Sequence, residues 1–333
     1  MKRRSLRAFV ALLALTILAL LANLCLGASG LGPIEMLRAA LGPGRESAAA
    51  RIFWYVRLPR ALAALLAGAA LSVAGALLQA VLRNPLAAPS VIGVNAGAGL
   101  CALVCMSLLP GLAALVPAAA FAGACLAAFA VYLLARFTGA SRSTIVLAGV
   151  AVNTILGACM DAIVTLIPDA VVNRSAFSIG GFANVSMGNL RFAAPLCALG
   201  LLLALLFRRE LELMALGDDV ARSLGLRVER FRALFLIAAA MLAGAAVSFS
   251  GLLSFVGLVS PHMARILCRN DSHIRLPNTA LFGAALCLIC DLIARTAFAP
   301  YELPVGIVLS FLGAPFFLYL LFRQKKRNRH DAT

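Results

Sequence analysis

The chain has 333 residues, of which 63% are hydrophobic, a mean hydropathy of +1.00 and a formal net charge of +16. Soluble domains use apolar residues for about half of their length, so this composition excludes a soluble protein and indicates a polytopic membrane protein. The basic residues lie between apolar runs, which argues against a nucleic-acid partner and for a role in membrane topology.

Apolar runs of helical length predict an all-α fold with about ten transmembrane helices in a single domain, residues 1–333. The first run, 8–26, is longer than the apolar part of a signal peptide, so we expect an uncleaved helix. A mixed segment follows up to Arg60, and Pro168 to Leu190 form a second polar stretch. The other nine helices are expected at 61–81, 91–109, 112–135, 143–167, 191–207, 231–249, 254–268, 277–298 and 304–322.

Residues 208–232 form a densely charged segment between two predicted helices. We predict that Gly217 and Gly225 interrupt a short helix there and that Asp218 and Asp219 cap the piece between them. A solvated loop with a helical turn is the simpler alternative, but the length, the glycines and an apolar stripe favour a surface that docks on a protein partner. The stripe has three- and four-residue spacing: Leu213, Leu216, Val220 and Leu224.

The positive charges predict that both termini and the segment 208–232 lie in the cytoplasm. With ten helices and an inside N-terminus, the inside segments carry 21 of the 29 Lys and Arg residues and the outside segments carry eight. This ratio agrees with the positive-inside rule. The eight outside residues are Arg38, Arg45, Arg51, Arg57, Arg60, Arg174, Arg191 and Arg295.

Two helices carry an internal repeat. Leu66–Pro85 and Leu242–Pro261 agree at ten of twenty positions without a gap, including Gly75 with Gly251. The two helices are five apart in the predicted order, so they run in opposite directions. An inverted repeat of this kind is a transporter architecture, with halves at about 61–167 and 231–322, although any two helices rich in alanine and glycine look alike.

The sequence resembles the FecCD family, the permease subunits of ABC importers for iron-siderophores, haem and vitamin B12. The resemblance extends from about Arg51 to Leu321 and depends on motifs in family-like order and spacing. These are Arg57-Leu-Pro-Arg60 with Gly68 and Gly75-Ala-Leu-Leu-Gln79; Asn84-Pro-Leu-Ala-Ala-Pro89 with Gly93 and Gly97-Ala98; Gly217-Asp-Asp-Val-Ala-Arg-Ser-Leu-Gly225; Phe255-Val-Gly-Leu-Val-Ser-Pro-His262 with Arg265; Glu302-Leu-Pro-Val-Gly306; and Gly313-Ala-Pro-Phe-Phe317.

The resemblance implies a type II ABC importer permease in the bacterial inner membrane. Such a subunit dimerises with itself or with a similar permease, is driven by two cytoplasmic ATP-binding subunits and receives cargo from an extracytoplasmic substrate-binding protein. It places three arginines at the docking site for the binding protein: Arg57, Arg60 and Arg295. It places the ATPase-coupling element at Leu216, Gly217, Asp218, Asp219, Ala221, Arg222, Leu224 and Gly225.

The residues themselves offer no enzyme site. The chain has no GxxxxGK[ST] loop, so it is not the ATPase. Its three histidines are scattered, and no nucleophile-base set is apparent, so we expect no metal, no cofactor and no catalytic residue. A secondary transporter and an intramembrane enzyme remain as alternatives, but neither explains the charged segment. An iron(III)-siderophore chelate is the expected cargo, with vitamin B12 and haem still open.

Five polar side chains inside predicted helices need partners. Asp161 should face a cavity, a partner or the outer rim, because a carboxylate facing lipid is costly. Asp291 and Arg295 have the i,i+4 spacing of an intrahelical pair. Gln79 and Asn153 are expected to make hydrogen bonds between helices.

Overall fold

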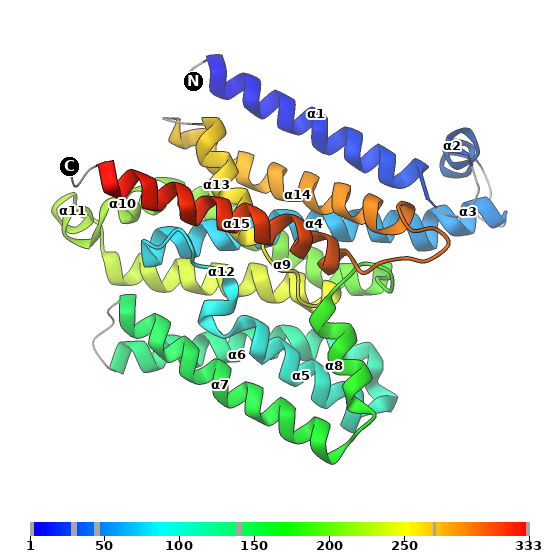
Figure 1. The fold of residues 1–333 in the computed structure, drawn as a ribbon, viewed down its shortest axis with the longest axis horizontal. Helices are drawn as coiled ribbons and strands as arrows, with labels where there is room; N and C mark the ends of the chain where they lie inside the picture. The colour runs from blue at the N-terminus through cyan, green and yellow to red at the C-terminus, as the bar shows by residue number, and fades with distance from the viewer. Residues whose placement is uncertain (1–2, 28–31, 43–46, 138–141, 269–270, 331–333) are drawn as a thin grey trace.

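The computed structural model describes residues 3–27, 32–42, 47–137, 142–268 and 271–330, and these ranges contain helices and no strand (Figure 1). The all-α prediction is therefore confirmed. The α-helices are α1 (Arg3–Cys25), α2 (Pro33–Leu41), α3 (Ala48–Ile52), α4 (Leu58–Leu82), α5 (Val94–Leu108), α6 (Val116–Phe137), α7 (Arg142–Leu166), α8 (Ala170–Ile179), α9 (Met187–Leu206), α10 (Arg208–Leu216), α11 (Asp218–Ser223), α12 (Val228–Ser250), α13 (Val256–Cys268), α14 (Ser272–Thr296) and α15 (Val305–His330).

Each of the ten predicted helices is present. Within the described ranges, seven helices are long and apolar enough to cross a membrane, and three shorter apolar helices lie at Val94–Leu108, Val256–Cys268 and Val305–Tyr319. The two polar stretches hold helices that the sequence analysis did not predict, namely α2, α3 and α8. These are short or carry charges, so hydropathy over a membrane-length window does not detect them.

The two helices of the internal repeat form the centre of the molecule. Of the most apolar windows of α4 and α12, 78% is buried inside the protein, against 17% for α7. Figure 1 shows α4 and α12 packed together and running in opposite directions, as the repeat predicted. Small side chains allow this close packing, since alanine and glycine let helix backbones approach.

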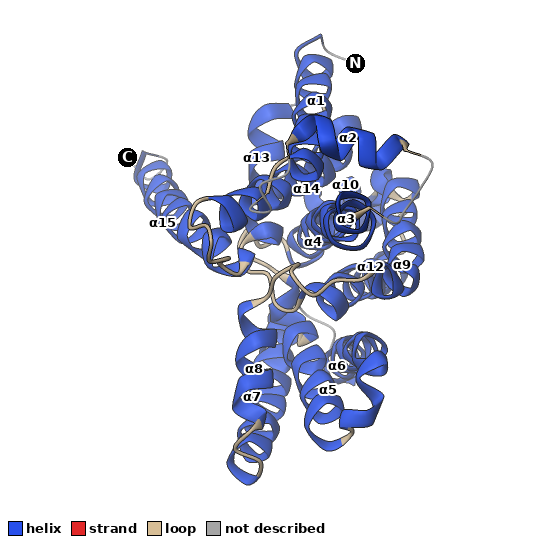
Figure 2. Cartoon of the chain, turned by 90° about the vertical axis from the view of Figure 1, so that its right-hand side faces the viewer, coloured by secondary structure: helices blue, strands red, loops and turns tan. Residues whose placement is uncertain are grey.

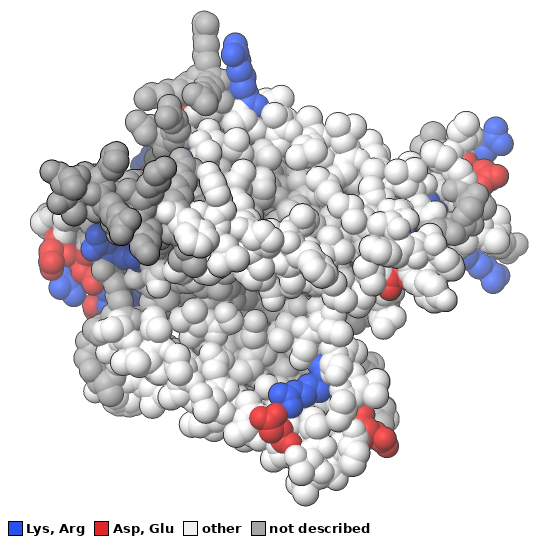
Figure 3. All heavy atoms as spheres, in the orientation of Figure 1, with Lys and Arg blue, Asp and Glu red and all other residues white. Residues whose placement is uncertain are grey.

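Figure 2 shows the remaining helices arranged around this centre. Helix α4 contacts α14, α12, α13, α9 and α10, while α5, α6, α7 and α8 pack on one another in a second group below. In Figure 3 most charged side chains gather at the two ends of the long axis and near the junction of α7 and α8, and most of the described surface between them on this face is uncharged. This distribution is that of a protein whose long axis crosses a bilayer.

Two ends of the molecule are used as reference points below. The α10–α11 end also holds the start of α1 and the end of α15, and the α2–α3 end lies opposite (Figure 1). Helices α4 and α14 connect the two ends, with α4 ending and α14 beginning at the α10–α11 end.

Candidate functional site

The α10–α11 end presents an apolar surface formed by Leu216, Val220 and Leu224. Their side chains are 57%, 46% and 58% exposed. Leu213, the fourth residue of the predicted stripe, is only partly exposed. Three large aliphatic side chains exposed on a charged, protruding element favour a site for a protein partner.

Helix α10 and helix α11 are anchored from their other side. Leu211, Met214 and Ala221 are buried against the body of the protein. Ala221, which the resemblance placed in the coupling element, therefore supports the surface from within. The exposed and buried faces together make α10 and α11 a fixed platform that presents the leucines.

Arg232 holds α11 onto α12. Its buried guanidinium pairs with Asp218 at 2.6 Å and with Glu229 at 3.2 Å. The sequence analysis counted Arg232 only among many charges of the segment and missed this role, because a pair between residues fourteen apart has no periodic signal. Buried charge pairs with direct hydrogen bonds are strong anchors once formed.

The glycines interrupt the segment as predicted. Gly217 has φ +124° and ψ 157°, and Gly225 has φ +82°, so both adopt conformations that favour glycine. The capping prediction is wrong: Gly217 itself is the N-cap of α11, and Asp218 pairs with Arg232 instead. Two further residues that the resemblance placed in the coupling element, Asp219 and Arg222, are exposed, and their charged groups lie 4.0 Å apart.

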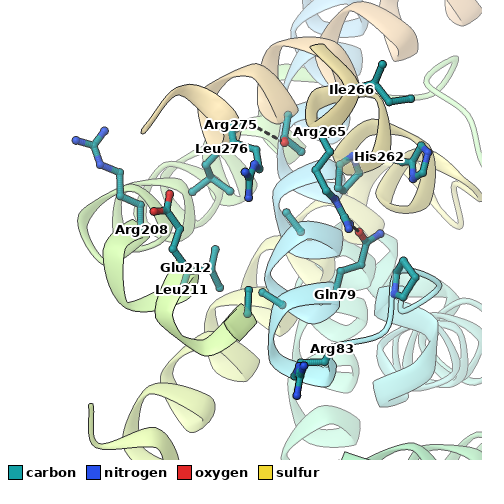
Figure 4. Close-up of a pocket in the computed structure, with 16 residues that line it drawn as sticks. Gln79, Arg83, Arg208, Leu211, Glu212, His262, Arg265, Ile266, Arg275 and Leu276 are labelled. Carbon is teal, nitrogen blue, oxygen red and sulfur yellow. Dashed lines mark hydrogen bonds between the residues drawn. The ribbon is translucent and has the colours of Figure 1, made fainter. Parts of the chain in front are cut away.

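The glycine- and proline-containing motifs meet where α4 crosses α13. A side chain at Gly75 would overlap the carbonyl oxygen of Gly257, so the crossing requires glycine at this position. One turn further along α4, Gln79 Nε2 donates to the same carbonyl oxygen at 3.3 Å, which confirms an interhelical hydrogen bond. Arg265 of α13 donates to Gln79 Oε1 in return (Figure 4).

The three arginines expected to dock a binding protein lie together at the α2–α3 end. Arg60 bridges two carboxylates, with Nε 2.9 Å from Asp291 and Nη1 2.7 Å from Glu302. Arg57 donates to the carbonyl oxygens of Leu24 and Cys25 at 3.0 and 2.7 Å. This cluster, Arg57, Arg60 and Arg295 with Asp291 and Glu302, is called the arginine network below.

The arginine network corrects one part of the prediction. All three arginines are buried, with 3%, 7% and 4% of their surface exposed. The expectation that their side chains lie exposed on the outer surface is therefore wrong. The physical reason is the packing of α1: Arg295 donates to the side chain and main chain of Asn23, which in turn donates to Leu288 of α14 at 2.7 Å. Contact with a binding protein stays a prediction.

The principal ion-pair partner of Asp291 is Arg60, and not Arg295 as the sequence predicted. Its closest approach to Arg295 is 3.8 Å, against 2.9 Å to Arg60 of α4. The i,i+4 spacing thus identified a real neighbour, but the principal ion pair connects two helices far apart in the chain. Asn23, which completes the network from α1, gave no signal beyond being polar within an apolar run.

Asp161 and Asn153 on α7 have partners outside that helix. Asp161 pairs with Arg174 of α8, and its side chain is mostly exposed, as expected for an acid at the rim. Asn153 Nδ2 donates to the carbonyl oxygen of Ser90 at 2.8 Å, so its hydrogen bond also joins separate elements.

Comparison with known proteins agrees with these features. The FecCD transport family matches residues 15–323. A hemin transport system permease protein, HmuU of Yersinia pestis, is 37% identical over 322 residues, which cover 93% of this chain and 95% of that protein. An achromobactin transport system permease protein, CbrC of Dickeya dadantii, is 38% identical over 94% of this chain and 90% of its own.

A solved structure has the same fold. It shows an inward-facing conformation of a transporter assigned to the metal-chelate ABC type, with a TM-score of 0.82 and 26% identity over 95% of this chain and 99% of that one. A cobalamin import system permease protein, BtuC of Halobacterium salinarum, is 38% identical over 80% of this chain and 72% of that protein.

Proposed function

This chain belongs to the FecCD transport family, and from that premise we propose that it forms the membrane pathway of an ABC importer for an iron(III)-siderophore-type chelate. The single observation that carries the proposal is the exposed surface of Leu216, Val220 and Leu224, fixed in place by buried contacts on its inner side. An importer permease needs such a rigid apolar contact to receive the motion of an ATPase.

The proposed coupling element comprises the eight residues given above, and Leu216 and Leu224 are its anchors. Large apolar side chains that fill a partner's groove contribute most of the energy of typical interfaces. Asp219 and Arg222 flank these anchors with opposite charges, which suits them to fix the register of docking rather than its strength.

We propose a complete importer of two permeases, identical or similar, with two ATP-binding subunits and one substrate-binding protein. The chain would act as one domain whose halves, 61–167 and 231–322, are related as an inverted repeat. The start of α1 and the end of α15 share the α10–α11 end (Figure 1), which supports placing both termini in the cytoplasm of a bacterial inner-membrane protein.

The substrate-binding protein would then meet the α2–α3 end. The exposed charges there include Glu35, Arg38 and Arg51, while the arginine network lies beneath and reaches the surface through Glu302, which is 44% exposed. Arg57, Arg60 and Arg295 remain in the proposal as residues that shape this docking surface.

Charge reversal at two depths tests the docking proposal. Arg51→Glu, on the surface, should weaken association with the purified binding protein and should be partly rescued by a Glu→Arg change on that protein. Arg60→Glu should instead destabilise the fold and lower the unfolding temperature, because the new carboxylate would lie beside those of Asp291 and Glu302. Normal association of both variants would place the docking site elsewhere.

The cargo is proposed from the relatives. Their names include achromobactin, iron(3+)-hydroxamate and Fe(3+)-citrate import, beside hemin and cobalamin. Iron(III) chelates are the most frequent of these, so we propose one of them as the substrate, with haem or vitamin B12 as the alternative. Binding of ferric hydroxamate, ferric citrate, haem and cobalamin to the purified binding protein would identify the class, and tight binding of haem or cobalamin alone would select the alternative.

Reconstitution tests the energy source. The purified chain in proteoliposomes should hydrolyse no ATP, should gain hydrolysis when the separate ATP-binding subunit is added, and should then transport the chelate delivered by the binding protein. A counter-flow of protons or sodium ions should have no effect. Hydrolysis by the chain alone, or uptake driven by an ion gradient without the ATPase, would contradict the proposal.

A further inference from the structure

A cavity of about 700 Å³ lies at the α10–α11 end, between α4, α10, α13 and α14 (Figure 4). Four arginines line it: Arg83, Arg208, Arg265 and Arg275. In Figure 4, Arg265 and Arg275 extend toward its centre from α13 and α14, while Arg83 and Arg208 lie at its edge. Glu212 is the one carboxylate among the described lining residues, so the lining has a large excess of positive charge.

Within the described part of the chain, these positive charges have no ion-pair partner. Among the residues that the structure describes, none of the four arginines forms an ion pair within 4.0 Å. Arg265 donates to the neutral Gln79, Arg208 donates to the carbonyl oxygen of His273 at 3.4 Å, and the buried Nε of Arg275 has no hydrogen-bond partner. Grouped cations in a cleft attract a counter-ion, because the surrounding protein concentrates their field.

Much of the remaining lining is apolar. Ala76, Ala80, Leu211, Ile266 and Leu276 line the cavity beside the arginines, together with the uncharged polar residues Gln79, His262 and Thr279. An inorganic anion surrounded by water gains nothing from such side chains, whereas an amphiphile can place its charged group on the guanidiniums and its hydrocarbon against the rest. The cavity therefore offers cationic side chains for the charged headgroup of a lipid and apolar side chains for the adjoining hydrocarbon.

The position of the cavity along the long axis also fits a lipid headgroup. The candidate span through α4 ends at Leu82, directly before Arg83, and the span through α14 begins at His273, two residues before Arg275. Arginines at the ends of spans lie level with the headgroups, and basic pockets between helices on the cytoplasmic side bind anionic lipid headgroups.

We propose that this cavity binds a phosphate-bearing anion, and that the occupant is the headgroup of an anionic phospholipid. The site would also touch the coupling element. A side chain added at Gly217 would approach Arg83 Nη1 at 3.0 Å, so Arg83 lies between the cavity and the junction of α10 with α11. A bound headgroup would thus hold α10 against α4 and α14; this consequence, unlike the binding itself, rests on the proposed function.

The binding test uses the full-length purified chain without its partners. Delipidated protein is titrated with phosphatidylglycerol, with phosphatidylcholine, and separately with inorganic phosphate in neutral detergent, and bound lipid is measured by native mass spectrometry and unfolding temperature. Phosphatidylglycerol should be retained in preference to phosphatidylcholine. Arg83→Gln with Arg275→Gln should weaken this retention about 25-fold, since each arginine near an anionic headgroup contributes about five-fold.

Matched controls separate the cavity from general surface charge. Arg209→Gln with Arg227→Gln removes the same charge from exposed residues of the same end that do not line the cavity, and should leave retention unchanged. Glu212→Gln removes the carboxylate of the lining and should increase retention several-fold, a gain that a misfolded variant does not produce.

Each outcome decides the proposal. Stabilisation by phosphatidylglycerol that the cavity variants remove supports a headgroup site, and equal stabilisation by inorganic phosphate supports a phosphate site filled from solution. Equal retention of both lipids, or equal loss in the cavity and control variants, overturns the proposal and makes the arginines a solvated surface. Coupled ATP hydrolysis in liposomes with and without phosphatidylglycerol then tests the consequence for coupling, and its failure alone would leave the binding site intact.

Discussion

Arginines gather at both ends of the long axis, and the two groups are treated in opposite ways. At the α2–α3 end, Arg57, Arg60 and Arg295 are buried and form ion pairs or hydrogen bonds with carboxylates, carbonyl oxygens and the side chain of Asn23. At the α10–α11 end, the arginines of the cavity form no ion pair with another described residue. The charges of the arginine network join α1, α4 and α14. The charges of the cavity arginines are available to bind a ligand.

The comparison shows that a residue type does not reveal its role. A buried ion pair is weak evidence for net stability, but removing one partner from it is strongly destabilising because a buried charge is left alone. An unpaired arginine beside water is easily replaced unless something binds to it. The two ends should therefore respond differently to the same kind of substitution, and four experiments test this difference.

The largest effect should come from Asp291→Asn in the arginine network. Arg60 and Arg295 would lose the buried carboxylate between them, and we expect a loss of about 3 kcal/mol in the free energy of unfolding. The loss should appear as a lower unfolding temperature of the detergent-solubilised protein. Glu302→Gln is the control: its carboxylate is 44% exposed, so about 1 kcal/mol or less is expected. Equal losses in the two variants would mean that burial does not decide how much a carboxylate of the arginine network contributes to stability.

Leu224→Asp should come next, and it should affect association rather than folding. The side chain is 58% exposed, so the unfolding temperature should stay unchanged, while binding to the ATP-binding subunit should weaken by about 2 kcal/mol or more. Ser223→Asp places the same charge on the exposed neighbouring residue and should weaken binding far less. If the Leu224→Asp variant still couples normally to the ATP-binding subunit, the α10–α11 segment only tethers its neighbouring helices and is not a docking surface.

Arg232→Met would show that the α10–α11 end also contains a buried arginine that is paired. The substitution removes the bonds to Asp218 and Glu229, with an expected loss of about 1.5 kcal/mol. Because the bond to Asp218 holds α11 onto α12, hydrogen exchange of the amides at 218–224 should accelerate while that of α4 stays constant. Arg230→Met, at an exposed position of the same helix, is the matched control. Unchanged exchange in the Arg232 variant would exclude the anchoring role.

The smallest effect should come from Asp161→Asn. Asp161 pairs with Arg174 at an exposed site, and such pairs contribute about 0.5 kcal/mol. The unfolding temperature should change little, and combining the substitution with Arg174→Gln should cost no more than either change alone. A loss similar to that of Asp291→Asn would show that exposure does not set the value of an ion pair in this protein.

Part of this architecture could be predicted because its signals are local. Ten apolar runs predicted ten helices, and the glycines at 217 and 225 predicted where the charged segment bends. The cap was predicted wrongly at Asp218. An acid after a glycine can cap a helix or form an ion pair, and Asp218 forms an ion pair because Arg232 lies beside it. Helix α8 was missed because its ten residues are too few and too polar to register as a span.

The sequence by itself determined that this is a membrane protein, which helices cross its core and where its surface leucines recur, because hydropathy and helical periodicity act between near neighbours. Only the tertiary structure decided which charges are paired. Arg60 and Asp291 are separated by 231 residues, and Asn23 meets Arg295 across 272. The packing of α1 and α14 against α4 sets both distances and excludes water from them, and no pattern within a single helix specifies that a guanidinium will be buried at one end and left open at the other.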